Sequence, residues 1–265
     1  MNGAELRGLA TTELGRRTVH LEEVDSTNRW LKESGDALPH GTVCYTGCQT
    51  RGRGRLGRTW KVPPGASLAM SVLLRQAEMD WSGLPLVSGI AVARALNRLA
   101  GDKFGVSFRI KWPNDIICGS RKVCGILCES SQGEQGRFAV VGIGVNLNQT
   151  EEDFQREELP CAASIKSLIG TAPSYGETAA AILNELEIVW GIYVRQGFLP
   201  LLAPYETLCA TVGREVRLLS PGGDLLPAGR AMGVAEDGGL IVDTAEGRRI
   251  FHSGEVSVRG LYDYI

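Results

Sequence analysis

The chain has 265 residues, of which 43% are hydrophobic and 22% are charged, and its formal net charge is −2. This composition is that of a globular protein with a sizeable core, and it excludes a molecule that binds nucleic acid through its overall charge. The sequence has neither the roughly 18 apolar residues of a membrane span nor a signal-peptide core at its start. We therefore expect a cytoplasmic protein.

Seven cysteines are spread along the chain, and none forms a C-x-x-C pair. An odd number without paired spacing is typical of reduced thiols. The three histidines lie far apart and away from paired cysteines, so a zinc site is not expected. Cys124 and Cys128, in "KVCGILCES", are expected to be small core-facing residues of a strand.

The first half of the chain alternates short apolar runs with turn residues. Strands are expected at 18–24, 41–49 and 67–75, because these runs are short and bounded by Gly, Pro or polar residues. In "DSTNRWLKESG", Ser26 and Thr27 can start a helix that Gly35 closes. A longer helix is predicted over 84–101, with Pro85 in its first turn and Gly101 at its end.

Three further strands are predicted at 106–118, 121–130 and 137–148, followed by a second long helix from about Tyr175 to Arg195. The hairpin-like spacing favours a mixed or mainly antiparallel sheet with helices on one face, an α+β fold. After about Val212 the chain changes to five short strand-like runs between Gly- and Asp-rich turns. We predict two domains, 1–211 and 212–265, the second being a small β-barrel.

The segment "QTRGRGRLGRTW", Gln49 to Trp60, nearly matches two phosphate-binding patterns, G-x-G-x-x-G and G-x-x-x-x-G-K-T. Both patterns deliver phosphate to the start of a helix. The chain continues with Pro63, Pro64 and Gly65, which do not allow a regular helix interior, so both matches are interpreted as accidental.

Four arginines remain in this segment, on a glycine-rich loop that can approach a ligand closely. Arginine binds phosphate or carboxylate through paired donors. Taken alone, the segment fits equally a solvated basic turn or a nucleic-acid-binding segment.

Three other motifs occur with this loop: "DSTN" at 25–28, "KWPNDI" with "GSRKVCGIL" at 111–127, and "GIGVNLN" at 142–148. Together the four motifs, in this order, resemble the biotin protein ligases, and the resemblance extends from about Val19 to the C-terminal strands. The family adenylates biotin and transfers it to a lysine of a carrier domain. The resemblance implies a mixed sheet flanked by helices, the class II synthetase-like biotin/lipoate ligase fold, with an SH3-like C-terminal barrel.

The resemblance also implies which residues contact biotin. They match the family's motifs at Ser26, Thr27, Asn28, Gln49, Arg53, Gly54, Arg55, Lys122 and Gly125. Lys122 is expected to reach both the biotin carboxylate and the α-phosphate that this carboxylate attacks. Considered without the motif, Ser26 and Thr27 would be a simple helix cap, and Lys122 a solvated strand end.

A second set of residues is expected on the ATP side: Arg53, Arg55, Arg58, Trp60, Lys111, Asn114, Gly144 and Asn146. Trp60 is a candidate to cover adenine, the alternative being a packed core aromatic. Asn146 is suited to an adenine edge, although it could merely end a strand. Asp115 could hold Mg²⁺ or orient the incoming lysine, and the sequence does not separate these roles. Lys122, Arg55 and Asp115 are the expected catalytic residues.

For the adenylation that the resemblance implies, the protein mainly has to bring anions together and to stabilise the added charge. The expected substrates are biotin and ATP with Mg²⁺, without a tightly bound prosthetic group, and the expected partner is a biotin carboxyl carrier protein domain. About two dozen residues precede Asp25, too few for the helix-turn-helix domain of some family members, so DNA binding is not expected. A homodimer is left open.

Two alternatives compete with this interpretation. A lipoate ligase performs the same adenylation on another acid, but the "GRGRLGR" loop and "KWPND" are of the biotin type. A nucleic-acid-binding module could use the arginine loop and the C-terminal strands, but the net charge argues against it.

Overall fold

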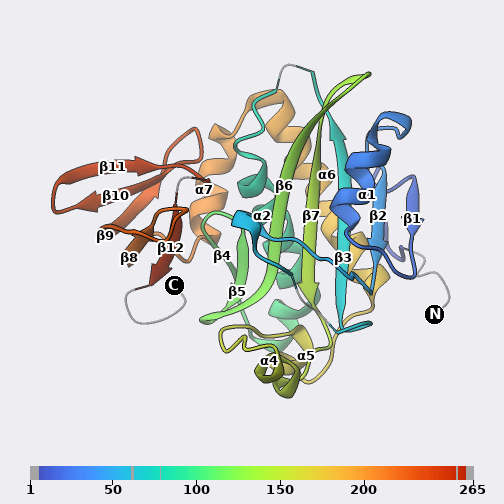
Figure 1. The fold of residues 1–265 in the computed structure, drawn as a ribbon, viewed down its shortest axis with the longest axis horizontal. Coiled ribbons are helices and arrows are strands. Elements are labelled where there is room, and N and C mark those ends of the chain that lie inside the picture. The colour runs from blue at the N-terminus through green and yellow to red at the C-terminus, as the bar shows by residue number, and fades with distance from the viewer. Residues whose placement is uncertain (1–5, 61–62, 78, 255, 261–265) are drawn as a thin grey trace.

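The computed structural model describes residues 6–60, 63–77, 79–254 and 256–260. Its centre is a seven-stranded sheet in the order β1-β2-β3-β7-β6-β5-β4 (Figure 1). The strands are β1 (Thr18–His20), β2 (Val43–Thr46), β3 (Ser67–Arg75), β4 (Phe108–Lys111), β5 (Asp115–Cys118), β6 (Arg121–Gly133) and β7 (Gly136–Asn146). β1 and β2 pair in parallel and the other neighbours pair antiparallel, so the predicted mixed sheet is confirmed.

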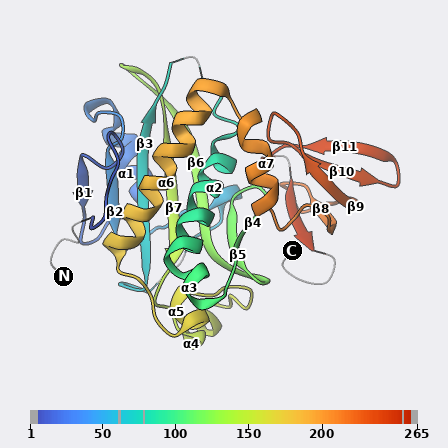
Figure 2. The ribbon, with the colours of Figure 1, turned by 180° about the vertical axis from the view of Figure 1, so that it is seen from behind.

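Helices cover both faces of this sheet. α2 (Leu84–Leu96) and α6 (Tyr175–Gln196) lie together on one face, as the view from behind shows (Figure 2), and α1 (Thr27–Ser34) lies on the other. β3 contacts both layers because its side chains alternate, with Leu73 packing among the residues around α1 and Val72 in the main core. The expectation that helices cover one face only is therefore wrong, and α1 is the exception.

Several predicted boundaries are also wrong. The strands expected over 18–24 and 41–49 are the shorter β1 (Thr18–His20) and β2 (Val43–Thr46). The helix expected to stop at Gly101 continues through a π-helical turn (Asn97–Gly101) into α3 (Asp102–Phe104), and it ends at Gly105, whose φ of 67° is left-handed. The single strand expected over 106–118 is two strands, β4 and β5, separated by the turn that contains Pro113. Three short helices were not predicted: α4 (Glu151–Arg156), α5 (Ile165–Ile169) and α7 (Leu199–Leu208).

The C-terminal strands occur where the sequence predicts them: β8 (Glu215–Leu219), β9 (Leu225–Val234), β10 (Leu240–Thr244), β11 (Gly247–Phe251) and β12 (Ser257–Gly260). They form an antiparallel sheet in the order β11-β10-β9-β8-β12. Within the described residues its two edge strands do not pair, so the predicted barrel is not closed. Closure is not needed to bury the apolar side chains, because Val216, Leu218 and Val242 join the main hydrophobic core.

The C-terminal sheet is tied to the large sheet by polar contacts as well. The indole Nε1 of Trp112 donates to the carbonyl of Gly238 at 3.1 Å, and the backbone N–H of Trp112 donates to Thr211 Oγ1 at 3.0 Å. The boundary at residue 212 stays a prediction. In the described part of the chain, no helix is both long and apolar enough to cross a bilayer.

Candidate active site

A cavity of about 860 Å³ opens against strands β3, β6 and β7, between the start of α1, the Gly/Arg loop and the C-terminal strands. All sixteen residues predicted for the site line it: Ser26, Thr27, Asn28, Gln49, Arg53, Gly54, Arg55, Arg58, Trp60, Lys111, Asn114, Asp115, Lys122, Gly125, Gly144 and Asn146. They come from segments up to about 120 positions apart in the chain. The fold thus brings the four motifs to one place, while the role of each residue stays a prediction.

One end of the cavity is formed by the first turn of α1. Ser26 caps the helix by accepting from the N–H of Arg29, so the simple capping role and a place in the cavity coexist. Gln49 Oε1 accepts from the backbone N–H of Thr27 at 2.8 Å. The side chains of Thr27 and Asn28 are almost fully buried, at 3% and 4% exposure. The side chains that this first turn presents to the cavity are therefore neutral and polar, and hydrogen bonds hold them in place.

The Gly/Arg loop is a small hairpin. Arg53 and Thr59 form an antiparallel bridge, and Gly54 N–H donates to the Arg58 carbonyl at 2.8 Å. Between them the chain makes a single 3₁₀ turn, Arg55–Gly57, with Leu56 at a φ of 54°. The described residues of the loop contain no α-helix, which agrees with the rejection of both phosphate-loop patterns.

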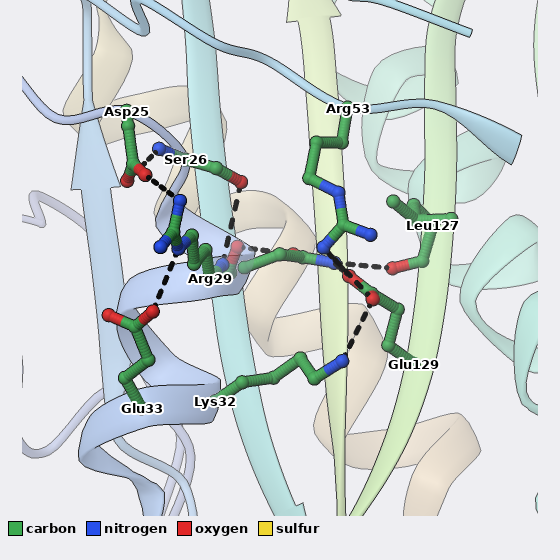
Figure 3. A network of polar contacts seen from close by, with 10 residues as sticks. Asp25, Ser26, Arg29, Lys32, Glu33, Arg53, Leu127 and Glu129 are labelled. Atoms are coloured by element: carbon green, nitrogen blue, oxygen red, sulfur yellow. Dashed lines mark hydrogen bonds and ion pairs between the residues drawn. The ribbon is translucent and has the colours of Figure 1, made fainter. Parts of the chain in front are cut away.

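Glu129 of β6 fastens this loop to α1. Figure 3 shows the side chains of Arg53 and Lys32 pointing at its carboxylate from the loop and from the helix. Arg53 Nη1 lies 3.1 Å from Oε1 and Lys32 Nζ lies 3.0 Å from the same atom. Burial opposes ionisation of Glu129, but hydrogen bonds from Asn28 and Lys32 and the nearby positive charges hold its pKa below the usual range.

Trp60 lies flat against the two glycines of the central strands. A Cβ on Gly144 would lie 2.8 Å from Trp60 Cε2, and one on Gly125 would lie 3.0 Å from Cζ3. Lys122 Nζ is 5.4 Å from the ring centroid, a cation–π distance. Among the described residues, the buried indole Nε1 has no hydrogen-bond partner. Trp60 is therefore part of the cavity wall rather than a residue of the hydrophobic core.

Positive side chains gather at the other end of the cavity. Lys122 Nζ forms an ion pair with Asp115 Oδ1 at 2.6 Å, and Arg55 Nη1 donates to Asn114 Oδ1 at 2.9 Å. Lys111 is 3% exposed. Burial lowers the pKa of Lys111 to about 7, the Asp115 charge opposes this, and the charge of Arg259 adds to it. This end is suited to an anion, which would compensate several partly buried cations.

Asn146 is 4% exposed and its amide is held by the protein. Its Nδ2 donates to the Ala163 carbonyl at 3.2 Å, and its Oδ1 accepts from Gln149 Nε2 at 2.8 Å. Gln149 also lines the cavity and was not predicted. Both the nitrogen and the oxygen of the Asn146 amide are therefore held by hydrogen bonds. A residue that merely ended the strand would not need both.

Two lining segments were missed by the sequence analysis. One runs from α4 into the following turn and includes Phe154 and Leu159; the other is Val256, Val258 and Arg259 from the C-terminal strands. The capping box at Thr150, confirmed in the structure, is the sequence signal that could have located α4. For the C-terminal residues no local signal exists, because only the packing of the second sheet brings them to the cavity.

Metal-binding side chains do not cluster in the described residues: no group of three His, Cys, Asp or Glu is found there. Asp115 can supply one carboxylate to Mg²⁺, which suits an ion held mainly by phosphate oxygens rather than a protein cage. The cysteines are free. Cys124 is buried as predicted, and Cys128 packs against the same core, where burial raises its pKa to about 12. Neither is a reactive thiolate.

Known proteins share both parts of this architecture. Residues 21–146 match the biotin/lipoate A/B protein ligase family, and residues 211–259 match the biotin protein ligase C-terminal domain. The bifunctional ligase/repressor BirA of Escherichia coli is 32% identical over 92% of this chain and 75% of its own. The biotin–[acetyl-CoA-carboxylase] ligase of Mycobacterium tuberculosis is 32% identical over 88% of this chain and 86% of its own.

A solved structure agrees with these sequence matches. The biotin protein ligase of Aquifex aeolicus, in complex with biotin and ATP, aligns with a TM-score of 0.78 at 32% identity, covering 92% of this chain and 99% of that one. With two matching domains, these relatives and one cavity that collects the predicted residues, the chain belongs to the biotin protein ligase family.

Proposed function

We propose that this protein activates biotin with ATP to biotinyl-5′-AMP and then transfers the biotinyl group to a lysine of a biotin carrier domain. The observation that carries the proposal is the difference in charge between the two ends of this cavity. The first turn of α1 presents neutral hydrogen-bonding groups at one end, where the charge of Arg53 is paired with Glu129, and Lys122, Arg55 and Lys111 stand at the other end. A ligand with a neutral polar ring and an anionic tail, next to a polyphosphate, fits this arrangement.

In the first step a biotin carboxylate oxygen bonds to the α-phosphorus of ATP while the bond to the bridging oxygen breaks and pyrophosphate leaves. Lys122 is assigned to contact both anions and to offset the charge that builds up between them. Arg55, held by Asn114, and Lys111 are assigned to the phosphates. Trp60 is assigned to the adenylate as one wall of its binding site.

Mg²⁺ would be held by Asp115 together with phosphate oxygens, and when bound it would supply further charge neutralisation. In the second step the carrier lysine must be neutral to attack the acyl carbon, after which AMP leaves. The alternative role for Asp115 is to orient that amine. The two assignments differ in outcome: the Mg²⁺ role predicts that Asp115→Asn impairs adenylation, and the amine role predicts that it impairs transfer alone.

Biotin-dependent exchange of pyrophosphate into ATP tests substrate and reaction together. We expect exchange with biotin and none with lipoate at the same concentration. Exchange with lipoate alone would assign the chain to the lipoate-transferring branch of this fold. Salt-dependent binding to nucleic acid, with no exchange for either acid, would favour the nucleic-acid module instead.

The acceptor is expected to be a biotin carboxyl carrier domain, and transfer to it is measured by the appearance of protein-bound biotin. A cytoplasmic location, consistent with seven free cysteines, stays a prediction, as does a homodimer.

A further inference from the structure

Four polar side chains from three separate segments form a continuous chain of contacts beside the α1 end of the cavity. They are Glu129 of β6, Asn28 and Thr27 of α1, and Ser71 of β3. Ser71 is fully buried at 0% exposure and does not line the cavity, whereas Thr27 and Asn28 do. Ser71 matches none of the motifs that identify the family, so a role for it can come only from its contacts.

The orientation of the Asn28 amide follows from its partners. Its nitrogen lies 3.1 Å from the Leu127 carbonyl and 3.0 Å from a carboxylate oxygen of Glu129, and both partners can only accept. Nδ2 therefore uses both of its hydrogens there. Asn28 Oδ1 consequently faces Ser71 Oγ, at 2.6 Å.

This orientation decides the direction of two hydroxyl groups. Asn28 Oδ1 has no hydrogen, so Ser71 must donate to it. Ser71 Oγ also lies 2.7 Å from Thr27 Oγ1, and with its own hydrogen already used it must accept from Thr27 there. The alternative acceptor for Thr27 is Gln49 Oε1, at the longer distance of 3.2 Å. In either arrangement the hydrogen of Thr27 stays within the protein.

A ligand that reaches Thr27 therefore meets an oxygen lone pair and no hydrogen. Asn28 has likewise spent both amide hydrogens on the protein. Gln49 Oε1, fixed by the backbone N–H of Thr27, adds another acceptor beside it. The complementary ligand group is an N–H donor, and a ring oxygen at the same place would set two lone pairs against each other.

We propose that Ser71 is a positioning residue that, through Asn28 and Glu129, presents Thr27 as a hydrogen-bond acceptor to a ureido N–H of the acid substrate. This rests on the proposed function, because it takes biotin as the ligand. The new element is that recognition of the ureido ring depends on the direction in which the Thr27 hydroxyl points. Ser71, which lies outside the cavity, sets that direction.

The first measurement is the dissociation constant for biotin, determined by titration calorimetry for the unaltered protein and for the Ser71→Ala variant. Ser88→Ala is the matched control, because Ser88 is also 0% exposed and donates to a carbonyl of its own helix, Leu84. We expect Ser71→Ala to weaken biotin binding by about 10-fold, since it leaves an acceptor unsatisfied and frees the hydroxyl of Thr27. Ser88→Ala should leave biotin binding unchanged.

The second measurement separates a positioning role from a general loss of packing. It uses the two cyclic carbamate analogues of biotin in which one or the other ureido N–H is replaced by oxygen, since these keep the ring size. The unaltered protein should bind one isomer much more weakly than biotin. In Ser71→Ala this difference in affinity should be about 10-fold smaller, because the freed Thr27 hydroxyl can turn and donate to the ring oxygen. A purely structural effect would weaken all three ligands by the same factor.

Equal losses for biotin and both analogues, or no loss for biotin, would overturn the proposal while leaving the ligase function in place. Absence of biotin binding by the unaltered protein would instead overturn the proposed function. Thermal unfolding of each variant accompanies the titrations, and if Ser71→Ala does not fold, Ser71→Cys serves in its place, because a thiol is a much weaker donor of similar size.

Discussion

Lys122 and Asp115 form an ion pair of 2.6 Å between strands β6 and β5, in the space left by the missing side chain of Gly125. Asp115 stands opposite Gly125 in the register, and Lys122 Nζ lies only 3.1 Å from the position that a Cβ on Gly125 would take. The ammonium therefore occupies the space that a side chain would otherwise fill. The Asp115 carboxylate holds this ammonium at the wall of the cavity, where an incoming anion can also contact it.

Lys122→Ala should depress formation of biotinyl-AMP more than binding of ATP, because the ammonium interacts most strongly with the charge of the transition state. A charge-assisted hydrogen bond of about 1.5–3 kcal/mol corresponds to a loss of about 10- to 100-fold in single-turnover rate. Arg121→Ala is the control, since that guanidinium is paired with Glu151 at 2.7 Å. Similar small effects of the two substitutions would show that Lys122 is not the residue that contacts the reacting anions.

Gly144→Ala should move Trp60, because the new methyl group would lie 2.8 Å from the indole ring. We expect the KM for ATP to rise on the order of 10-fold, a cost typical of one overpacked methyl group. Gly222→Ala is a suitable control, since its Cβ would make only ordinary contacts at 3.5 and 3.6 Å. An unchanged KM in Gly144→Ala would mean that the indole wall does not contribute to nucleotide binding.

Hydrogen exchange can test how the Gly/Arg loop is fastened. We expect amides in 51–58 to exchange more slowly once biotin and ATP are added, because an anion neutralises the four arginines. In Glu129→Gln the loop loses its charged partner for Arg53, so exchange without ligand should be faster than in the unaltered protein. Glu33→Gln removes a carboxylate from the exposed side of α1 instead, and should leave this loop unaffected. Identical exchange in the two variants would count against the fastening role.

ATP binding should take up protons at pH 7.5. The pKa of Lys111 is lowered to about 7 by burial, so most of this amine is neutral above that pH. A bound phosphate stabilises the charged form and raises the pKa, which draws a proton from the buffer. Calorimetry in buffers of different ionisation enthalpy measures this uptake directly.

Lys111→Met should abolish most of the uptake, whereas Lys103→Met, at an exposed position, should retain it. The same protonation makes the KM for ATP rise as pH increases through 7, since the neutral amine no longer attracts phosphate. A flat pH profile for ATP binding between pH 6 and 9 would contradict the assignment of Lys111 to the phosphates.

Local patterns in the sequence predicted most helices and strands, and the resemblance of four motifs to a known family supplied the candidate site residues, which line one cavity. The short apolar run at 67–75 predicts β3 to the residue, and Ser26 and Gly35 mark the two ends of α1, because a bounded apolar run and a helix cap both depend on neighbours a few positions away. The prediction that the helix ends at Gly101 was wrong. It is packed against Asn97 and Val106 inside a continuing helix, and the left-handed turn falls at Gly105.

The tertiary structure alone decided which side chains meet. Ser71 is an ordinary small residue in a buried strand, and it gains a role only because β3, β6 and α1 place Asn28 and Thr27 within hydrogen-bond reach of it. Whether the C-terminal strands close was likewise settled by packing, since the core they share with the large sheet already buries their apolar face. Local propensity acts over a few residues, whereas strand register and layer packing bring together atoms that lie tens of positions apart.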